Sequence, residues 1–329
     1  MPTKRSAARA RTPGVLRIAT RSSELALRQA RLVHDALGAR RTAAELVTFK
    51  TTGDKRIDEP LSGIGAKGLF TKELEKALRA GKVDCCVHSL KDLPTDMPDE
   101  LSIVAVLERE DPRDVLVVND GIAAESLDDL PRGSRVGTSS LRRRAQLLGA
   151  RPDLDVVELR GNVPTRLKKV DDGKVHAAIL AAAGLRRLGV QQRIDAWLEP
   201  PAWLPAAGQG AIAVQVRADD ARIIELLSPL DHAATSVAVR AERAFLSALD
   251  GGCQVPIGAL VTTSVTGLVL YGLIADAHGT RIIRGEEPVD ANAPERAAER
   301  LAAELLRRGG DFVLAQLRNL EKVPAPQPK

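Results

Sequence analysis

The stretch Val83-Asp-Cys-Cys-Val87, followed at once by His88-Ser-Leu-Lys91-Asp92-Leu-Pro94, decides how the chain is organised. Its first part predicts a buried β-strand, and its second part predicts a polar turn. A buried strand that ends in a polar turn is typical of open α/β sheets, which bind ligands along the edge formed by the strand ends. Asp92 stands out in this turn because it is an acid beside Lys91. It is either an ion-pair or turn-capping residue, or a carboxylate able to stabilise a developing cation or exchange a proton.

Other polar clusters follow predicted strands in the same way as Ser89, Lys91 and Asp92. These clusters are Thr20-Arg21 with Ser23, Thr138-Ser139-Ser140, Arg160 with Asn162, and Gly184 with Arg187. Helix N-termini at such an edge add unpaired N–H groups and a positive dipole end, both of which favour anions. A single arginine is more often a solvated surface charge, but five clusters at equivalent places predict an anion-binding cleft.

The charge of the chain is concentrated in one segment. The net charge of +5 includes the basic side chains of residues 1–14, which contain no acid and predict a short disordered tail. Residues 135–193 carry thirteen basic and five acidic side chains, which suggests that an anionic ligand is held there. This segment has no aromatic residue on which nucleic-acid bases could stack, so we expect no nucleic-acid partner.

The 329 residues predict two or three domains, and the order of the predicted elements shows where they divide. Strands alternate with helices as far as the charged run Glu108–Asp114, where we expect the chain to cross into a second α/β unit. Pro200, Pro201 and Pro205 mark a return, and a strand is expected at 211–216. After residue 256 the strands come first and the helices follow, which predicts a small α+β domain. No apolar run is long enough to predict a membrane span, and residues 1–14 do not resemble a signal peptide.

Cys253 lies in the sequence Asp250-Gly-Gly-Cys-Gln-Val-Pro-Ile-Gly258. Glycines allow another group to approach closely, so this thiol is either reachable and reactive or an inert buried cysteine. The chain has only three cysteines, and Cys85 and Cys86 are adjacent in an apolar run. Such a set cannot form a disulfide framework and favours a reducing compartment.

Together these stretches resemble the porphobilinogen deaminase family, also called hydroxymethylbilane synthases, from about Val15 to Leu320. The motifs that carry the resemblance are Ile18–Ser23, Gly65–Glu75, His88–Pro94, Glu110–Asp114, Gly137–Arg143, Leu159–Val163, Ala207–Gly210 and Gly251–Gly258. The basic tail, Arg144 and the sequence of the loop at 50–66 differ from the family pattern, and none of these differences removes a residue that the family uses.

The resemblance implies three domains: two doubly wound α/β units like those of solute-binding proteins, and a small α+β domain at the C-terminus. Residues 15–107 with 208–229 would form the first domain, and residues 112–204 the second, inserted one. Residues 233–320 would form the third domain, between the tails 1–14 and 321–329. The implied enzyme is a cytoplasmic, monomeric transferase of haem (tetrapyrrole) biosynthesis, with no metal and no membrane partner.

By the same resemblance, Cys253 would carry a dipyrromethane cofactor through a thioether, and Asp92 would be the catalytic residue. Four porphobilinogen molecules would condense head to tail with loss of ammonia, and water would then release hydroxymethylbilane. The cofactor and the growing chain carry acetate and propionate groups, which arginine can bind through paired charge-assisted bonds. The residues expected to bind them are Arg21, Ser23, Lys67, Ser89, Lys91, Thr138, Ser139, Ser140, Arg142, Arg143, Arg160, Asn162, Arg166, Arg187 and Gln209.

Two other function classes remain open at this point. A non-catalytic solute-binding module would use the same cleft and would carry no covalent adduct on Cys253. A cysteine hydrolase would pair Cys253 with His88, which requires the imidazole to lie within hydrogen-bond reach of the thiol.

Overall fold

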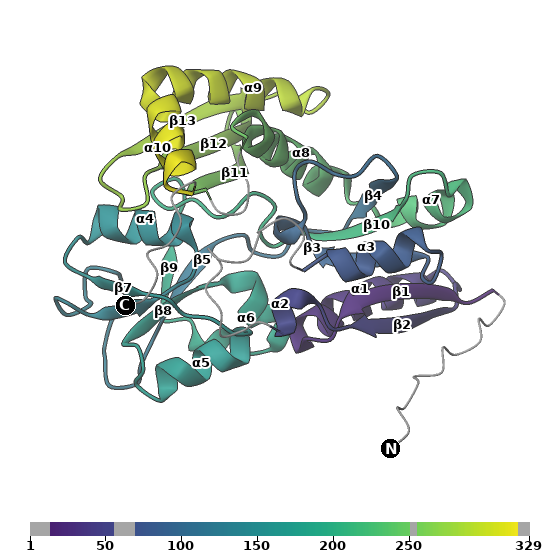
Figure 1. Ribbon diagram of the computed structural model, residues 1–329, viewed down its shortest axis with the longest axis horizontal. Helices are drawn as coiled ribbons and strands as arrows, with labels where there is room; N and C mark the ends of the chain where they lie inside the picture. Colours follow the sequence, from purple (N-terminus) through teal and green to yellow (C-terminus); the bar gives the residue numbers. More distant parts are fainter. Residues whose placement is uncertain (1–13, 56–69, 251–254, 322–329) are drawn as a thin grey trace.

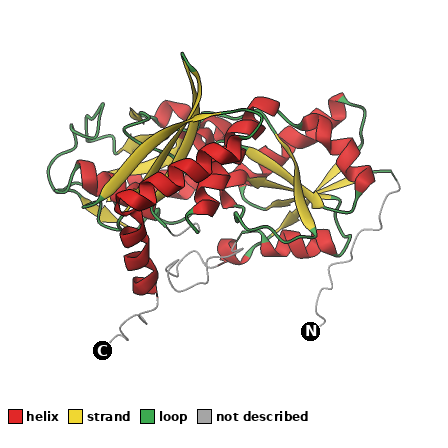
Figure 2. Ribbon diagram, turned by 90° about the horizontal axis from the view of Figure 1, so that it is seen from above, coloured by secondary structure: helices red, strands yellow, loops and turns green. Residues whose placement is uncertain are grey.

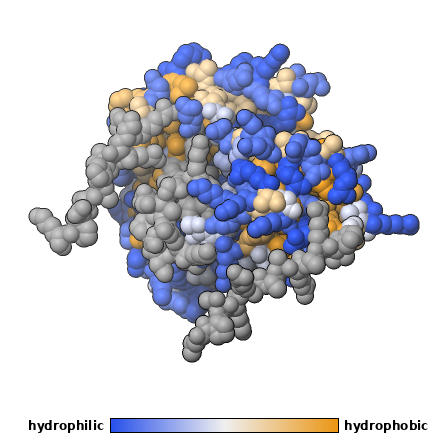
Figure 3. All heavy atoms as spheres, turned by 45° about the vertical axis from the view of Figure 1, so that its right-hand side comes forward, coloured by the Kyte–Doolittle hydropathy of each residue, from blue (hydrophilic) through white to orange (hydrophobic). Residues whose placement is uncertain are grey.

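The computed structural model describes residues 14–55, 70–250 and 255–321. Two units, each a sheet flanked by helices, lie side by side, and a smaller unit packs above them in the view of Figure 1. Seen from above, helices flank the strands of these units (Figure 2). The face shown in Figure 3 is mostly hydrophilic, with apolar patches between the charged side chains.

The first sheet has the strand order β2-β1-β3-β10-β4, in which only β10 runs antiparallel to its neighbours. Its strands are β1 (Leu16–Arg21), β2 (Ala44–Phe49), β3 (Cys85–Ser89), β4 (Leu101–Val106) and β10 (Ile212–Arg217). The helices of this unit are α1 (Glu24–Ala39), α2 (Thr52–Lys55), α3 (Lys72–Arg79) and α7 (Ala221–Leu227). Ala30, Val33 and Leu37 recur at helical spacing along α1, so that one side of the helix packs on the apolar side chains of β1 and β3.

The second sheet repeats this arrangement with the order β7-β6-β8-β5-β9, and β5 is its antiparallel strand. Its strands are β5 (Asp114–Val118), β6 (Arg135–Gly137), β7 (Asp155–Val157), β8 (Ala177–Ala181) and β9 (Ala196–Leu198). Its helices are α4 (Leu141–Ala150), α5 (Val163–Asp171) and α6 (Ala182–Leu188). The sequence analysis predicted no strand at β5 or β9 and, in the first unit, no helix at α2 or α7.

The third unit is an antiparallel sheet with the order β11-β12-β13, covered by helices. Its elements are α8 (Ala233–Ala248), β11 (Ile257–Ser264), β12 (Gly267–Ala275), β13 (Ile282–Val289), α9 (Pro294–Leu305) and α10 (Asp311–Glu321). Phe245, Leu270 and Leu301 meet in its core. The predicted fold class, two α/β units and a small α+β unit at the C-terminus, is therefore confirmed.

Two chain segments cross between the larger sheets, and they run side by side. The amide of Leu107 donates to the Ile212 carbonyl at 3.0 Å, and the amide of Glu110 donates to the Gly210 carbonyl at 3.2 Å. Gly210 has a φ of +87°, and a Cβ at this position would lie 2.2 Å from the Glu110 carbonyl oxygen. Only glycine fits here, because any side chain would force the two crossing segments apart.

Candidate active site

Side chains from both larger sheets line one small cavity of about 90 Å³. Its charged and polar lining comes from the end of β3, from α1 and from the three helices of the second unit. Among the residues expected to bind the ligand, those that line it are Ser89, Lys91, Arg143, Arg166 and Arg187. The structure therefore brings together residues that are up to about a hundred positions apart in the sequence, at the strand ends where the cleft was predicted.

Asp92 ends the short 3-10 turn η2 (Leu90–Asp92), directly after β3. Its Oδ2 lies 3.9 Å from Nη1 of Arg21, the last residue of β1, and its side chain is 30% exposed. The Arg21 guanidinium also bonds Asp54 and lies 4.2 Å from the centre of the Phe70 ring. Asp92 is thus part-exposed and lies beside a cation that other groups hold in place.

Arg142 and Arg143 were expected to bind the ligand, and the structure pairs both with a buried acid of the second unit. They are 5% and 6% exposed and both bond the fully buried Asp114 at 2.7 Å. Burial opposes ionisation of Asp114, yet the two arginines hold the pKa of this carboxyl well below its usual range. Sequence reasoning missed Asp114 as a site residue; its signal is an acid at the start of the apolar run Val-Leu-Val-Val.

Lys91 is held by the side chain of Gln209, whose Oε1 accepts from Nζ at 3.1 Å. Burial and the nearby charge of Arg143 lower the pKa of Lys91 to about 8, against the opposite effects of Asp92 and Asp114. The charge on Lys91 therefore depends on the second unit as well as on its own turn.

Arg143, Arg160 and Arg166 carry more donors than the described residues satisfy. Nη1 of Arg160 and Nε of Arg143 are buried and have no partner among those residues. Arg166 bonds only the Gly161 carbonyl, and burial, with Arg143 and Arg160 close by, lowers its pKa to about 10. Because the cations here outnumber their counter-ions, the cleft suits a ligand with several carboxylates.

The hydroxyl and amide groups at the helix starts make local bonds. Ser23, Ser140 and Asn162 are the N-caps of α1, α4 and α5, and each accepts from an amide of the first turn. Ser139 donates to the Leu159 carbonyl at 2.8 Å, and the Thr138 hydroxyl accepts from the Ser140 amide. Ser89 bonds Gln29 of α1, a residue that the predictions did not include. The caps direct the free amides of α4 and α5 toward the cleft edge.

Comparison with known proteins decides the family. The family model "Porphobilinogen deaminase, dipyromethane cofactor binding domain" matches residues 16–225, and "Porphobilinogen deaminase, C-terminal domain" matches residues 236–307. A porphobilinogen deaminase of Moorella thermoacetica is 50% identical over 92% of this chain and 96% of its own length. One of Roseiflexus castenholzii is 48% identical over 91% of this chain and 98% of its own length. The chain belongs to the porphobilinogen deaminase family.

Family membership confirms the predicted enzyme class, a transferase of tetrapyrrole biosynthesis with a small-molecule substrate and a dipyrromethane cofactor. Among solved structures, the methionine-binding protein MetQ matches with a TM-score of 0.43 and 16% identity, over 67% of this chain and 90% of that chain. Cys253 and Lys67, two residues expected in a porphobilinogen deaminase site, lie outside the described residues.

His88 is buried, and its Nε2 lies 3.1 Å from Oε1 of Gln215. Burial lowers the pKa of His88 to about 4, so the ring is neutral at physiological pH and faces the core of the first sheet. A general base needs access to its substrate. Because His88 is buried, its position favours a deaminase over a cysteine hydrolase that uses His88 as its base.

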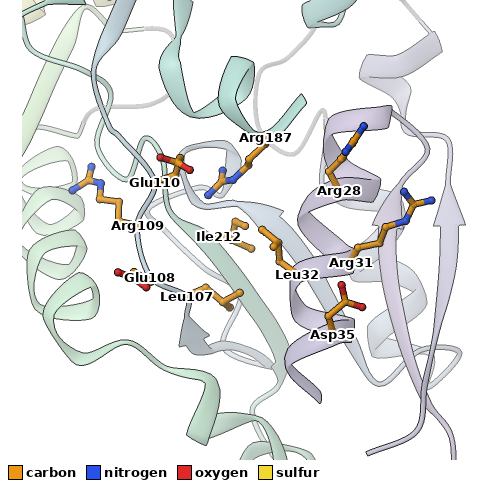
Figure 4. Close-up of a pocket in the computed structure, with 10 residues that line it drawn as sticks. All are labelled: Arg28, Arg31, Leu32, Asp35, Leu107, Glu108, Arg109, Glu110, Arg187 and Ile212. Atoms are coloured by element: carbon orange, nitrogen blue, oxygen red, sulfur yellow. The ribbon is translucent and has the colours of Figure 1, made fainter. Parts of the chain in front are cut away.

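A larger pocket, of about 850 Å³, lies between α1 and the crossing segments, and no sequence motif pointed to it. Figure 4 shows Leu32 of α1 and Ile212 in the middle of this pocket, with Arg187 between Glu110 and Arg28. Arg187 lines this pocket as well as the small cavity, so the two spaces are neighbours. In the described ranges no cluster of three or more His, Cys, Asp or Glu could hold a metal, and no helix there has the length and apolarity to cross a bilayer.

Proposed function

We propose that this cleft condenses four porphobilinogen molecules head to tail, with loss of ammonia, on a dipyrromethane primer and releases hydroxymethylbilane. The observation that carries the proposal is the meeting of Lys91, Arg143, Arg166 and Arg187 on one cavity close to Asp92. Porphobilinogen and its oligomers carry an acetate and a propionate on every ring. A site with cations on both walls can bind such a chain through charge-assisted hydrogen bonds.

The described residues fit the cofactor that the family implies. The unpaired buried nitrogens of Arg143 and Arg160 are donors that need an acceptor, and carboxylate groups supply acceptors. We propose that Cys253 holds the cofactor through a thioether, and that Arg21, Lys91 and the arginines of the second unit bind its carboxylates. When bound, dipyrromethane supplies the electron-rich pyrrole to which the substrate units are joined.

Asp92 is the residue that we assign to the chemistry. Its carboxylate can accept hydrogen bonds from pyrrole N–H groups and stabilise the positive charge that develops as porphobilinogen loses ammonia. Because its side chain is part-exposed, it can also exchange a proton with the incoming ring. Arg21 limits where the carboxylate can point, since their separation is only 3.9 Å.

The remaining assignments extend this proposal. Lys67 would also bind the ligand, and so would the hydroxyl and amide groups that keep bonding capacity beyond their local contacts: Ser23, Ser89, Thr138, Ser139, Ser140 and Asn162. We propose that residues 15–107 with 208–229, 112–204 and 233–320 act as three domains. We propose that the protein acts as a monomer in the cytoplasm, without nucleic-acid or membrane partners. The low cysteine content agrees with a reducing compartment.

Incubation of the purified chain with porphobilinogen tests the proposal. Ammonia and hydroxymethylbilane should appear together, and the Asp92→Asn variant should lose both. If the chain binds porphobilinogen tightly but releases no ammonia, the proposal is wrong and the chain is a non-catalytic solute-binding protein.

A further inference from the structure

Gln209 lies on the returning crossing segment and is 1% exposed. Its side-chain oxygen accepts from Lys91 Nζ at 3.1 Å. Its side-chain nitrogen donates to the Pro112 carbonyl and to Oδ1 of Asp114, both at 2.7 Å. Both hydrogens of the amide are therefore used within the protein, which leaves Gln209 little capacity to bind a ligand.

The backbone of the same residue is fixed from the third unit. Nε of Arg109 donates to the Gln209 carbonyl at 2.8 Å, and the Arg109 guanidinium makes two bonds to Glu242 of α8, at 2.6 and 3.0 Å. Glu242 is fully buried and also accepts from the Gly208 amide at 2.7 Å. Gln209 thus contacts the turn Leu90–Asp92 of the first unit and Asp114 at the start of β5 in the second unit. Through Arg109 it is also connected to the third unit.

The carboxylate of Asp114 completes this connection. Each of its oxygens accepts two side-chain hydrogen bonds: Arg143 and Gln209 bond Oδ1, and Arg142 and Trp203 bond Oδ2. A carboxylate with four donors cannot turn without breaking several bonds at once. It therefore fixes both the guanidinium of Arg143 on the cavity wall and the amide of Gln209.

We propose that Gln209 and Asp114 are positioning residues, which set Lys91 and Arg143 at a fixed separation across the cleft and tie that separation to the third unit. The proposal rests on the proposed function and revises the part that listed Gln209 among the ligand-binding residues. The amide has a direction: it accepts from Lys91 and donates to Asp114. Neither a carboxylate nor an apolar side chain can replace both ends of this connection.

The pKa of Lys91 can be measured without turnover, and it depends on the hydrogen bond between Lys91 and Gln209. The charged groups that act on it are Arg143, Asp92, Asp114 and Arg142. The test is an NMR titration of the purified, cofactor-bearing chain with isotope-labelled lysine side chains, in which Lys91 is assigned by its loss in Lys91→Arg. Gln209→Met should lower the pKa of Lys91 because the acceptor is lost. Gln209→Glu should raise it because a carboxylate replaces the amide.

A matched control exists in the second unit. Gln146 of α4 is also buried, but within the described part of the chain its amide bonds only the backbone of Leu204. Gln146→Met should leave the Lys91 titration unchanged and kcat within about twofold of wild type. Both Gln209 variants should lose about tenfold to a hundredfold in kcat, since small misplacements of positioned groups have effects of that size.

Opposite shifts of the Lys91 titration in the two Gln209 variants would support the proposal. An unchanged titration in both would overturn it, and so would losses of activity that merely follow the melting temperature across all three variants. Absence of turnover in the wild-type chain would instead count against the proposed function, and the titration would still decide the positioning role.

Discussion

The guanidinium of Arg21 lies 3.9 Å from Oδ2 of Asp92, although the two residues are far apart in the sequence. The register of the first sheet brings them together, because β1 and β3 are neighbouring parallel strands and both residues lie at their carboxyl ends. A parallel pair places its strand ends on the same edge, so an acid and a base that follow two such strands must meet there.

Asp92→Asn should reduce kcat by about a hundredfold or more, as expected when a group that stabilises charge and moves a proton is lost. Steady-state kinetics measure this effect, and the melting temperature should change little because the side chain is part-exposed. Asp153→Asn, at an ion pair with Arg151 on the surface, is the control and should retain wild-type kinetics. Equal rates in all three proteins would remove Asp92 from the mechanism.

The activity should depend on the charge of Lys91. Its pKa of about 8 predicts that kcat/KM falls above that pH, as the site loses a cation that binds carboxylates. In Lys91→Arg, kcat/KM should stay high at a higher pH than in wild type, since a guanidinium stays protonated. A profile that is the same in both proteins would show that another group titrates.

The same shift has a consequence for stability. Folding depresses the pKa of Lys91 from its ordinary value of 10.5 to about 8, so between these values the unfolded chain binds more protons. The contribution of Lys91 to stability therefore rises with pH across this window, falls as pH decreases from 10.5 toward 8, and stays constant below that. Comparison of unfolding free energies of wild type and Lys91→Met at pH 7.5 and 10 measures the difference.

Arg160→Ala should weaken ligand binding because it removes a guanidinium whose buried Nη1 has no partner among the described residues. Either KM for porphobilinogen should rise by about tenfold or more, or the fraction of chains carrying cofactor should fall, as for the loss of a charge-assisted bond. Arg193→Ala removes a cation paired with Asp171 at the surface and provides the control. If the two variants behave alike, Arg160 does not bind the ligand.

Asp114→Asn should destabilise the fold by about 3–5 kcal/mol, because it leaves Arg142 and Arg143 buried without their counter-ion. The folded pKa of Asp114 is depressed, so its contribution to stability is present above the ordinary carboxyl value of 3.8 and is lost as pH falls below it. Urea unfolding at pH 7 checks the first statement. A loss of less than about 1 kcal/mol would show that the arginines find other partners.

Much of this fold could be predicted from local patterns, and the exceptions have physical reasons. The strand Cys85–Ser89 and the helix caps Ser23 and Ser140 are local signals, so the sequence contains all the information that they need. The strand β5 was missed because its first residue, Asp114, is a charged group at a buried position. That burial is stable only because Arg142 and Arg143, in a helix further along the chain, supply the opposite charges.

In the site, too, some features follow from local sequence signals and others only from contacts made in the folded chain. Its cations could be predicted because they follow strand ends, which are visible in the sequence. The exposure of each cation could not be predicted, since it depends on which side of a helix meets the sheet and on partners such as Gln209. The roles of Arg142 and Gln209 therefore became apparent only from their contacts.

The most direct test of the account is the intact mass of the purified chain. We expect the wild-type protein to be heavier than its sequence by two linked pyrrole units, and we expect Cys253→Ser to show the mass of the sequence alone and no activity. A wild-type chain of unmodified mass that still turns over porphobilinogen at full rate would contradict the account.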